Sequence, residues 1–304
     1  MSEFMRPIPF KDLMEWALEE YKNEASIFGI KKEKFYKNES GKMLKTVFGD
    51  EISSAVGPAA GPQSQLAQNI IASYLTGARF IELKTVQKLD GEDIQKAVAK
   101  PCINSEDECY NCEWSTELTV KEAYNEYVKA YFAIIALAKE LNISDKKDFA
   151  YNMSVGYDLE GIKSEKIDTY IENLRNAKDT EVFKECKLYL EENIDKFSKF
   201  DKKDLEKIST NICDSITLST LHGCPAEEIE KIASYLIDEK KISTFIKCNP
   251  TMLGYEYARK TLDDMGFDYI SFTDFHFKDD LQYEDAVVMI ERLLDLAKKN
   301  DLAF

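Results

Sequence analysis

Two lysines stand at the ends of apolar, strand-like stretches of this 304-residue chain. Lys84 precedes Thr85 in "FIELKT", and Lys247 ends the apolar run of "STFIKCNPT". Lysines are rarely needed for packing at such positions. They can serve chemistry instead, because an ammonium group stabilises negative charge and a neutral amine is a nucleophile. Both are candidate functional groups. The structural alternative for Lys84 is a surface lysine at a fraying strand end.

Hydroxyl, imidazole and thiol groups gather in the segment "TLSTLHGCP", which begins at Thr217. Cys224 lies just before Pro225 and a predicted helix. The N-terminus of a helix favours a thiolate by roughly 0.3–1 kcal/mol when exposed. His222 is the nearest alternative group that titrates near neutral pH.

The segment "SSAVGPAAGPQSQLAQNII", residues 53–71, is poor in large side chains because it is rich in glycine, alanine and proline. Ala59, Ala60 and Gly61 fall where a strand should lead into a helix. A tight turn explains this composition, and so does a large flat ligand lying against the main chain.

Short segments rich in β-branched and aromatic residues recur along the chain and alternate with helical patterns. We predict strands within residues 53–60, 79–86, 148–157, 214–223, 243–251 and 268–275. Helices are predicted over residues 10–28, 118–141, 224–240 and 281–299, the second with a capping box formed by Thr119 and Glu122. Strands alternating with helices indicate a parallel sheet with right-handed crossovers.

These elements predict an α/β fold of the TIM (β/α)₈ type that is incomplete, with about six of eight strands. We expect an N-terminal helical extension over residues 1–46, including a stripe of Leu13, Trp16, Ala17 and Tyr21. The truncated barrel then spans 47–304, starting with a small hairpin across Gly49 and carrying a charged helical insertion at 175–207. "NDLAF" at the end of the sequence resembles the approach to another strand.

The composition excludes several classes of protein. Lys+Arg 40 against Asp+Glu 56 gives a net charge of −16, which disfavours binding to nucleic acid or to anionic membranes. There is no signal peptide or membrane-spanning run. Seven cysteines in a chain of this length do not indicate a secreted disulfide framework, so we expect a cytoplasmic protein with free thiols and no metal centre.

The chain resembles the FMN-binding barrels of dihydroorotate dehydrogenases and dihydropyrimidine dehydrogenase. "EISSAVGPAAGP" is similar to their Asn-Pro-x-Gly-Leu-Ala-Ser/Ala-Gly turn, although Ser54-Ala55 replaces Asn-Pro, and "FIELKTVQ" is similar to their strand ending in Lys-Thr. "MRPIPF", "GPAAGPQSQLAQNI", "NMSVGYDLEGIK" and "TLHGCP" resemble more closely a bacterial family of proposed selenate reductase subunits. Its members are large multi-domain relatives of dihydropyrimidine dehydrogenase.

The resemblance implies a role for each matching residue. Ala59, Ala60 and Gly61 would leave the main chain open to the flat flavin ring. Lys84, with Thr85, would lie at the flavin's pyrimidine edge, where negative charge collects on reduction. Lys247 would make a second flavin contact.

A substrate segment is implied by "CYNCEWSTEL", in which Asn111 and Glu113 match an Asn-x-Glu motif of the dihydropyrimidine enzyme. An amide and a carboxylate can read the alternating N–H and C=O groups of a pyrimidine-like ring. The alternative is that both residues cap a loop. Thr217 matches a substrate-binding Asn.

Thr220 occupies the position of the family's acidic Cys. Either Cys224 supplies the proton from the same loop, or Thr220 is a poor acid and the chemistry is altered or absent.

The expected function is therefore an FMN-dependent oxidoreductase acting on a pyrimidine- or purine-catabolite-like heterocycle. FAD and iron–sulfur clusters would belong to other domains or subunits. A second hypothesis is a catalytically silent fragment or partner-dependent module, because the family's phosphate-binding loops follow the last strands. A third is a Schiff-base lyase that uses Lys84 or Lys247.

Overall fold

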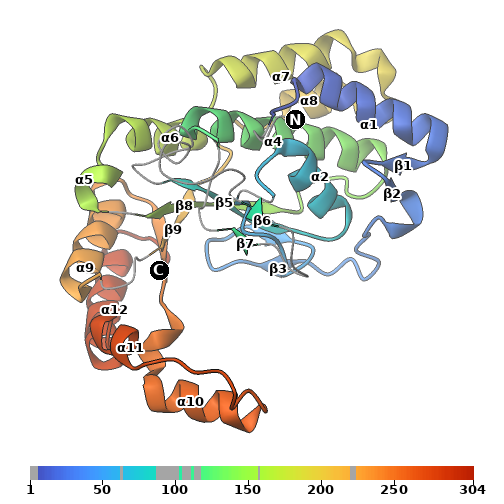
Figure 1. Ribbon diagram of the computed structural model, residues 1–304. Helices are drawn as coiled ribbons and strands as arrows, with labels where there is room; N and C mark the ends of the chain where they lie inside the picture. The colour runs from blue at the N-terminus through green and yellow to red at the C-terminus, as the bar shows by residue number, and fades with distance from the viewer. Residues whose placement is uncertain are drawn as a thin grey trace. The chain divides into compact units, whose positions relative to one another are not determined.

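The computed structural model describes residues 6–61, 64–86, 103–104, 111–112, 118–156, 158–219 and 224–304 (Figure 1). The chain divides into two compact units. Unit 1 comprises residues 1–153 and 165–214, and unit 2 comprises residues 154–164 and 215–304. None of the helices in this described part combines the length and the apolar character needed to cross a bilayer.

The strands of unit 1 are β1 (Ser26–Ile27), β2 (Ile30–Lys31), β3 (Leu44–Lys45), β4 (Glu51–Ile52), β5 (Phe80–Val86), β6 (Ile103–Asn104) and β7 (Asn111–Cys112). Strand β8 (Ala150–Gly156) runs from unit 1 into unit 2, which also holds β9 (Ser215–Ser219) and β10 (Ser243–Lys247). The main sheet is parallel and has the strand order β10-β9-β8-β5. Four of the predicted strand segments are therefore confirmed.

The helices of unit 1 are α1 (Phe10–Glu24), α2 (Ala67–Leu75), α4 (Val120–Glu140), α6 (Glu165–Arg175), α7 (Glu181–Glu192) and α8 (Lys202–Glu206), with short 3₁₀ turns at Lys32–Lys34 and Ile194–Lys196. Unit 2 contains α5 (Leu159–Ile162), α9 (Ala226–Ser234), a π-helical turn at Tyr235–Glu239, a 3₁₀ turn at Pro250–Leu253, α10 (Tyr255–Asp264), α11 (Phe275–Asp279) and α12 (Tyr283–Lys299).

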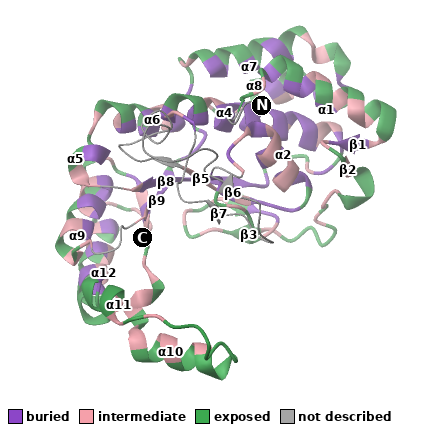
Figure 2. Ribbon diagram, in the orientation of Figure 1, coloured by how far each residue is buried: buried purple, intermediate pink, exposed green. Residues whose placement is uncertain are grey.

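Helix α4 is the centre of the apolar core of unit 1. The predicted capping box starts it: the Thr119 hydroxyl accepts the Glu122 N–H at 3.2 Å, and the Glu122 carboxylate accepts the Thr119 N–H at 2.9 Å. Most of the helix is buried (Figure 2). Phe132 packs against Phe10 of α1 and Phe183 of α7. The charged segment 175–207 is thus helical, as predicted, and its apolar face is part of this core.

The predicted hairpin is present as the antiparallel pair β3–β4, in which Leu44 lies opposite Ile52. Gly49 has a φ of 96°, a left-handed conformation that glycine adopts without strain. A second hairpin, β1–β2, follows α1 and was not predicted. Trp16 is 44% exposed and packs on Phe28 of this hairpin, so the prediction that it faces the core with Leu13 is wrong.

A buried ion pair joins Arg79, which precedes β5, to Asp148, which lies just before β8. The Arg79 Nε lies 2.8 Å from the Asp148 carboxylate, and the Arg79 side chain is fully buried. Asp148 also accepts hydrogen bonds from the hydroxyl groups of Ser53 at 2.6 Å and Tyr74 at 2.7 Å. Buried charges are stable in a fold only when they are paired and hydrogen-bonded in this way.

In unit 2, helices α9 and α12 pack together and are tied by a two-armed ion pair. Arg292 contacts the Glu230 carboxylate at 2.7 and 2.6 Å. The apolar residues Ile229, Ile232 and Ala233 of α9 are buried.

The strand predicted at residues 268–275 is absent. The segment is irregular and exposed, and Phe275 begins the short helix α11. The outer edge of β10 contacts the end of the chain instead, because the Thr244 N–H donates to the Ala303 carbonyl at 3.2 Å. "NDLAF" forms no strand in the structure, although Ala303 lies beside β10.

Candidate functional site

The side-chain-poor segment lies beside β5 as an isolated parallel bridge between Ala59 and Glu82. The Glu82 N–H donates to the Pro58 carbonyl at 3.1 Å, and the Ala60 N–H donates to the Glu82 carbonyl at 2.7 Å. This pattern directs both backbone groups of Ala59 away from β5. Ala59 is exposed, and no described residue accepts a hydrogen bond from its N–H.

Close backbone packing explains the glycine of this segment. A Cβ atom added at Gly57 would lie 1.7 Å from the Phe80 carbonyl oxygen, so no larger residue fits there. Ala60 is fully buried and Gly61 is also buried. The small residues therefore serve packing at three positions and leave the Ala59 N–H open, while the Ala59 carbonyl accepts the Gly61 N–H at 2.8 Å.

A hydrogen-bonded cluster joins this turn to the end of β5. The Tyr127 hydroxyl of α4 donates to the carbonyl of Ala60 at 3.2 Å and contacts the carbonyl of Lys84. The Gln65 amide donates to the Lys84 carbonyl at 2.8 Å and to the Tyr127 hydroxyl at 3.0 Å. Gln65 and Tyr127 are fully buried, and burial raises the pKa of Tyr127 well above its usual range. The hydroxyl is thus neutral and positions both carbonyls.

The neighbouring residue of α4, Glu126, fixes the start of α2. Its carboxylate accepts the Ala67 N–H at 2.8 Å and forms an ion pair with Lys129. Burial raises the pKa of Glu126, while Lys129 and the Ala67 N–H oppose the rise. A carboxylate at a helix N-terminus stabilises the helix, so Glu126 holds the end of the turn that contains Ala59.

Lys84 and Glu82 lie on one face of β5, because residues two apart in a strand point to the same side. The Lys84 Nζ lies 3.6 Å from the Glu82 Oε1 atom, and the Lys84 side chain is 17% exposed. The Glu82 Oε1 atom is buried and has no hydrogen-bond donor among the described residues. Sequence patterns alone did not indicate roles for Glu82, Gln65 or Tyr127. Only Glu82 had a local signal, its two-residue spacing from Lys84.

In unit 2, Thr217 and Lys247 share one face of the β9–β10 pair. Phe245 lies opposite Thr217, and Lys247 lies opposite Ser219 two residues later. Thr217 is buried, whereas Lys247 is exposed. Lys247 is the last residue of β10, as predicted, whereas Thr217 lies in the middle of β9 and not at its carboxyl-terminal end.

The Cys224 thiol lies in unit 2, immediately before the N-cap residue of α9, Pro225. Burial raises its pKa, and the negative charges of Glu228 and Asp280 add to the rise. The pKa of Cys224 is therefore raised, first by burial and then by the two acids, and not lowered as its place before a helix predicted. Burial and Asp280 likewise raise the pKa of Cys248. A protonated thiol can donate a proton.

Four predicted site residues cannot be placed by their side chains. Thr85 belongs to β5 and Asn111 to β7, but their side chains lie outside the described residues. Glu113 and Thr220 lie outside them entirely, as does His222.

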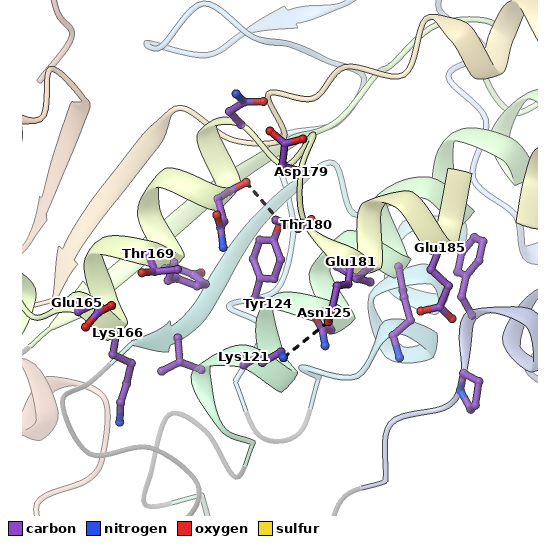
Figure 3. Close-up of a pocket in the computed structure, with 18 residues that line it drawn as sticks. Lys121, Tyr124, Asn125, Glu165, Lys166, Thr169, Asp179, Thr180, Glu181 and Glu185 are labelled. Atoms are coloured by element: carbon purple, nitrogen blue, oxygen red, sulfur yellow. Dashed lines mark hydrogen bonds and ion pairs between the residues drawn. The ribbon is translucent and has the colours of Figure 1, made fainter. Parts of the chain in front are cut away.

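A large cavity of unit 1, about 860 Å³, lies among the helices (Figure 3). Its walls come from α4, α6, α7 and the turn between the last two. Tyr124 crosses it, and its hydroxyl donates to the Thr180 hydroxyl at 3.1 Å. None of the predicted site residues lines this cavity.

Comparison with known proteins gives the family. A sequence model of "Oxidoreductase YgfK, N-terminal TIM-barrel domain" matches residues 28–304. Two proteins named "Putative oxidoreductase YgfK", from Escherichia coli strain K12 and Escherichia coli O157:H7, are each 45% identical over 316 residues, which cover 100% of this chain. The chain spans only 30% of the length of either relative. No solved structure matches.

These matches confirm the predicted family and the TIM-barrel fold class, to which the parallel sheet conforms. The chain belongs to the oxidoreductase YgfK family and corresponds to its N-terminal TIM-barrel domain.

Proposed function

We propose that this chain forms the FMN-binding barrel region of an oxidoreductase that acts on a pyrimidine- or purine-catabolite-like heterocycle. The observation that carries the proposal is the exposed Ala59 peptide on a turn that is fixed to β5 and, through Tyr127, to the Lys84 carbonyl. The family name supports oxidoreductase activity in general, and the resemblance to FMN barrels supports the flavin.

The residues present fit such a group. A flat ring needs a hydrogen-bond donor on a backbone free of bulky side chains, and the Ala59 N–H meets this requirement. The next two residues, Ala60 and Gly61, are small and buried. An ammonium group is also needed, and Lys84 provides it from the neighbouring strand.

When bound, FMN would exchange a hydride with the substrate. The protein would then supply charge, orientation and a proton. Lys84 would stabilise negative charge at the pyrimidine edge, and Lys247 would add a second contact. The protonated Cys224 thiol would donate the accompanying proton, with Thr220 as the alternative on the same loop. Asn111, Glu113 and Thr217 would read the substrate ring.

We propose further that the remainder of a longer protein covers part of unit 2. Most of the large apolar side chains that are exposed in the described chain lie between residues 253 and 288, including Tyr257, Met265 and Tyr269. Helix α10 has no buried residue (Figure 2). Exposed apolar surfaces of this kind mark interaction sites. Because the relatives are more than three times as long, other domains carrying FAD and iron–sulfur clusters are the proposed partners.

A Schiff-base lyase is less well supported. Its lysine must react as a neutral amine, whereas Lys84 is ion-paired with Glu82. The two functions can be separated directly. The purified protein is titrated with FMN while flavin fluorescence is followed, and a parallel sample is treated with borohydride and a carbonyl compound. Quenching that saturates supports the proposal. Covalent trapping without flavin binding would overturn it in favour of the lyase. If the protein shows no flavin binding and no covalent trapping, the hypothesis of a catalytically silent module remains.

A further inference from the structure

The carboxylate of Glu82 has an unmet hydrogen-bonding requirement. Its Oε1 atom is buried and receives no hydrogen bond from the described residues. Its neighbour is the Lys84 ammonium group at 3.6 Å, which is beyond ordinary hydrogen-bond length. A buried carboxylate oxygen without a donor is costly, so this atom is expected to have a partner in the functional state.

Among the described residues, no contact of the Glu82 side chain other than that with Lys84 explains why an acid is needed here. The two side chains project from one face of β5, where an apolar residue would suit the packing of a strand. The backbone of Glu82 already pairs with the 58–60 turn through both its N–H and its carbonyl. The side chain therefore adds nothing to that pairing and is left to interact on the same side as Lys84.

We infer that Glu82 and Lys84 together recognise the imide edge of a bound heterocyclic ring. The Lys84 ammonium donates to a ring carbonyl, and the Glu82 carboxylate accepts the adjacent ring N–H. A donor and an acceptor side by side match the C=O and N–H groups that alternate along such an edge. This inference rests on the proposed function and assigns the edge to the flavin's pyrimidine ring, whose only N–H in the oxidised form is at N3.

The pairing also gives specificity. A ring that cannot donate at this position leaves the Glu82 oxygen buried and unpaired, and such a loss discriminates strongly between ligands. Glu82 also provides a resident negative charge beside Lys84, so the ammonium is held on this face before the ring binds.

The test uses two probes, FMN and its N3-methyl derivative, which lacks this N–H. Dissociation constants are measured by flavin fluorescence for the wild type, Glu82→Ala and Glu82→Gln. Glu51→Gln is the matched control, because Glu51 is also ion-paired, with Lys146, but on the β3–β4 hairpin. Circular dichroism establishes that each variant is folded.

The wild type and the control should bind N3-methyl-FMN at least about tenfold more weakly than FMN, as expected for an unpaired buried acceptor. The ratio of the dissociation constant of N3-methyl-FMN to that of FMN should fall to about one in Glu82→Ala. It should remain above one in Glu82→Gln, whose amide oxygen still accepts a hydrogen bond. Equal ratios in the wild type and Glu82→Ala would overturn the inference while leaving flavin binding intact. Failure of the wild type to bind FMN would overturn both this inference and the proposed function.

Discussion

The Tyr127 hydroxyl donates to the carbonyl of Ala60 at 3.2 Å, across 67 residues of sequence. The same oxygen contacts the carbonyl of Lys84 and accepts a hydrogen bond from the Gln65 amide. One phenol on α4 therefore fixes both the side-chain-poor turn and the end of β5, the two places where the proposed flavin contacts occur.

Replacing Tyr127 by Phe should weaken FMN binding about tenfold, because the Ala60 carbonyl loses its side-chain donor and the turn loses its link to the Lys84 carbonyl. The matched control is Tyr131→Phe. Tyr131 lies one turn further along the same helix and is equally buried, but its ring packs on Phe149 and Tyr151. Titration with FMN measures the difference. Equal affinities of the two variants would show that the Tyr127 hydroxyl does not position the site.

The buried pair Arg79–Asp148 should contribute to stability and not to binding. Changing Asp148 to Asn leaves a buried guanidinium without its counter-charge, which costs about 3–5 kcal/mol in comparable buried pairs. The control is Asp214→Asn, since the Arg175–Asp214 pair is partly exposed and should cost about 1 kcal/mol or less. Urea unfolding measures the free energy of unfolding of each variant. Similar losses for both variants would contradict the assigned role of burial.

The two thiols of unit 2 should react slowly with iodoacetamide at neutral pH, since alkylation requires the thiolate and the pKa values of Cys224 and Cys248 are raised. Their rates should increase with pH above the range in which an ordinary cysteine ionises. Asp280→Asn removes a negative charge that raises both pKa values, so both pH profiles should shift to lower pH. Mass spectrometry of tryptic peptides follows each site.

Glu227→Gln is the control for this experiment, because Glu227 lies in the first turn of α9 but does not contribute to either shift. A profile unchanged in Asp280→Asn would show that the charge of Asp280 does not raise the two pKa values. Rapid alkylation of Cys224 at pH 7 in the wild type would contradict its proposed role as a protonated acid.

The sequence predicted the repeating elements well, because strand and helix signals are local. Strands β5, β8, β9 and β10 are short apolar runs, and α4 carries its own capping box. Residues 268–275 show why local pattern is insufficient. Their alternating apolar residues suit a strand, but a strand also needs a free neighbouring edge, and the β10 edge contacts Ala303.

The candidate site could be predicted only in part, for a similar reason. Lys84 and Ala59 were identifiable because each breaks the local pattern. Gln65 and Tyr127 become partners only through tertiary packing, at a separation of 62 residues. The raised pKa of Cys224 also depends on Asp280, which is distant in sequence, so the helix-terminus argument alone gave the wrong direction.

The central claim is that a flat redox-active ring lies against the exposed peptide of Ala59, and a bulky side chain there tests it most directly. Ala59→Phe changes an exposed residue, so the fold should tolerate it, and Val56→Phe is a control on the same segment that is also exposed. FMN titration should show wild-type affinity for Val56→Phe and a loss of at least about 100-fold for Ala59→Phe, as expected when a ring is excluded from its site. Wild-type affinity of Ala59→Phe for FMN would contradict the claim.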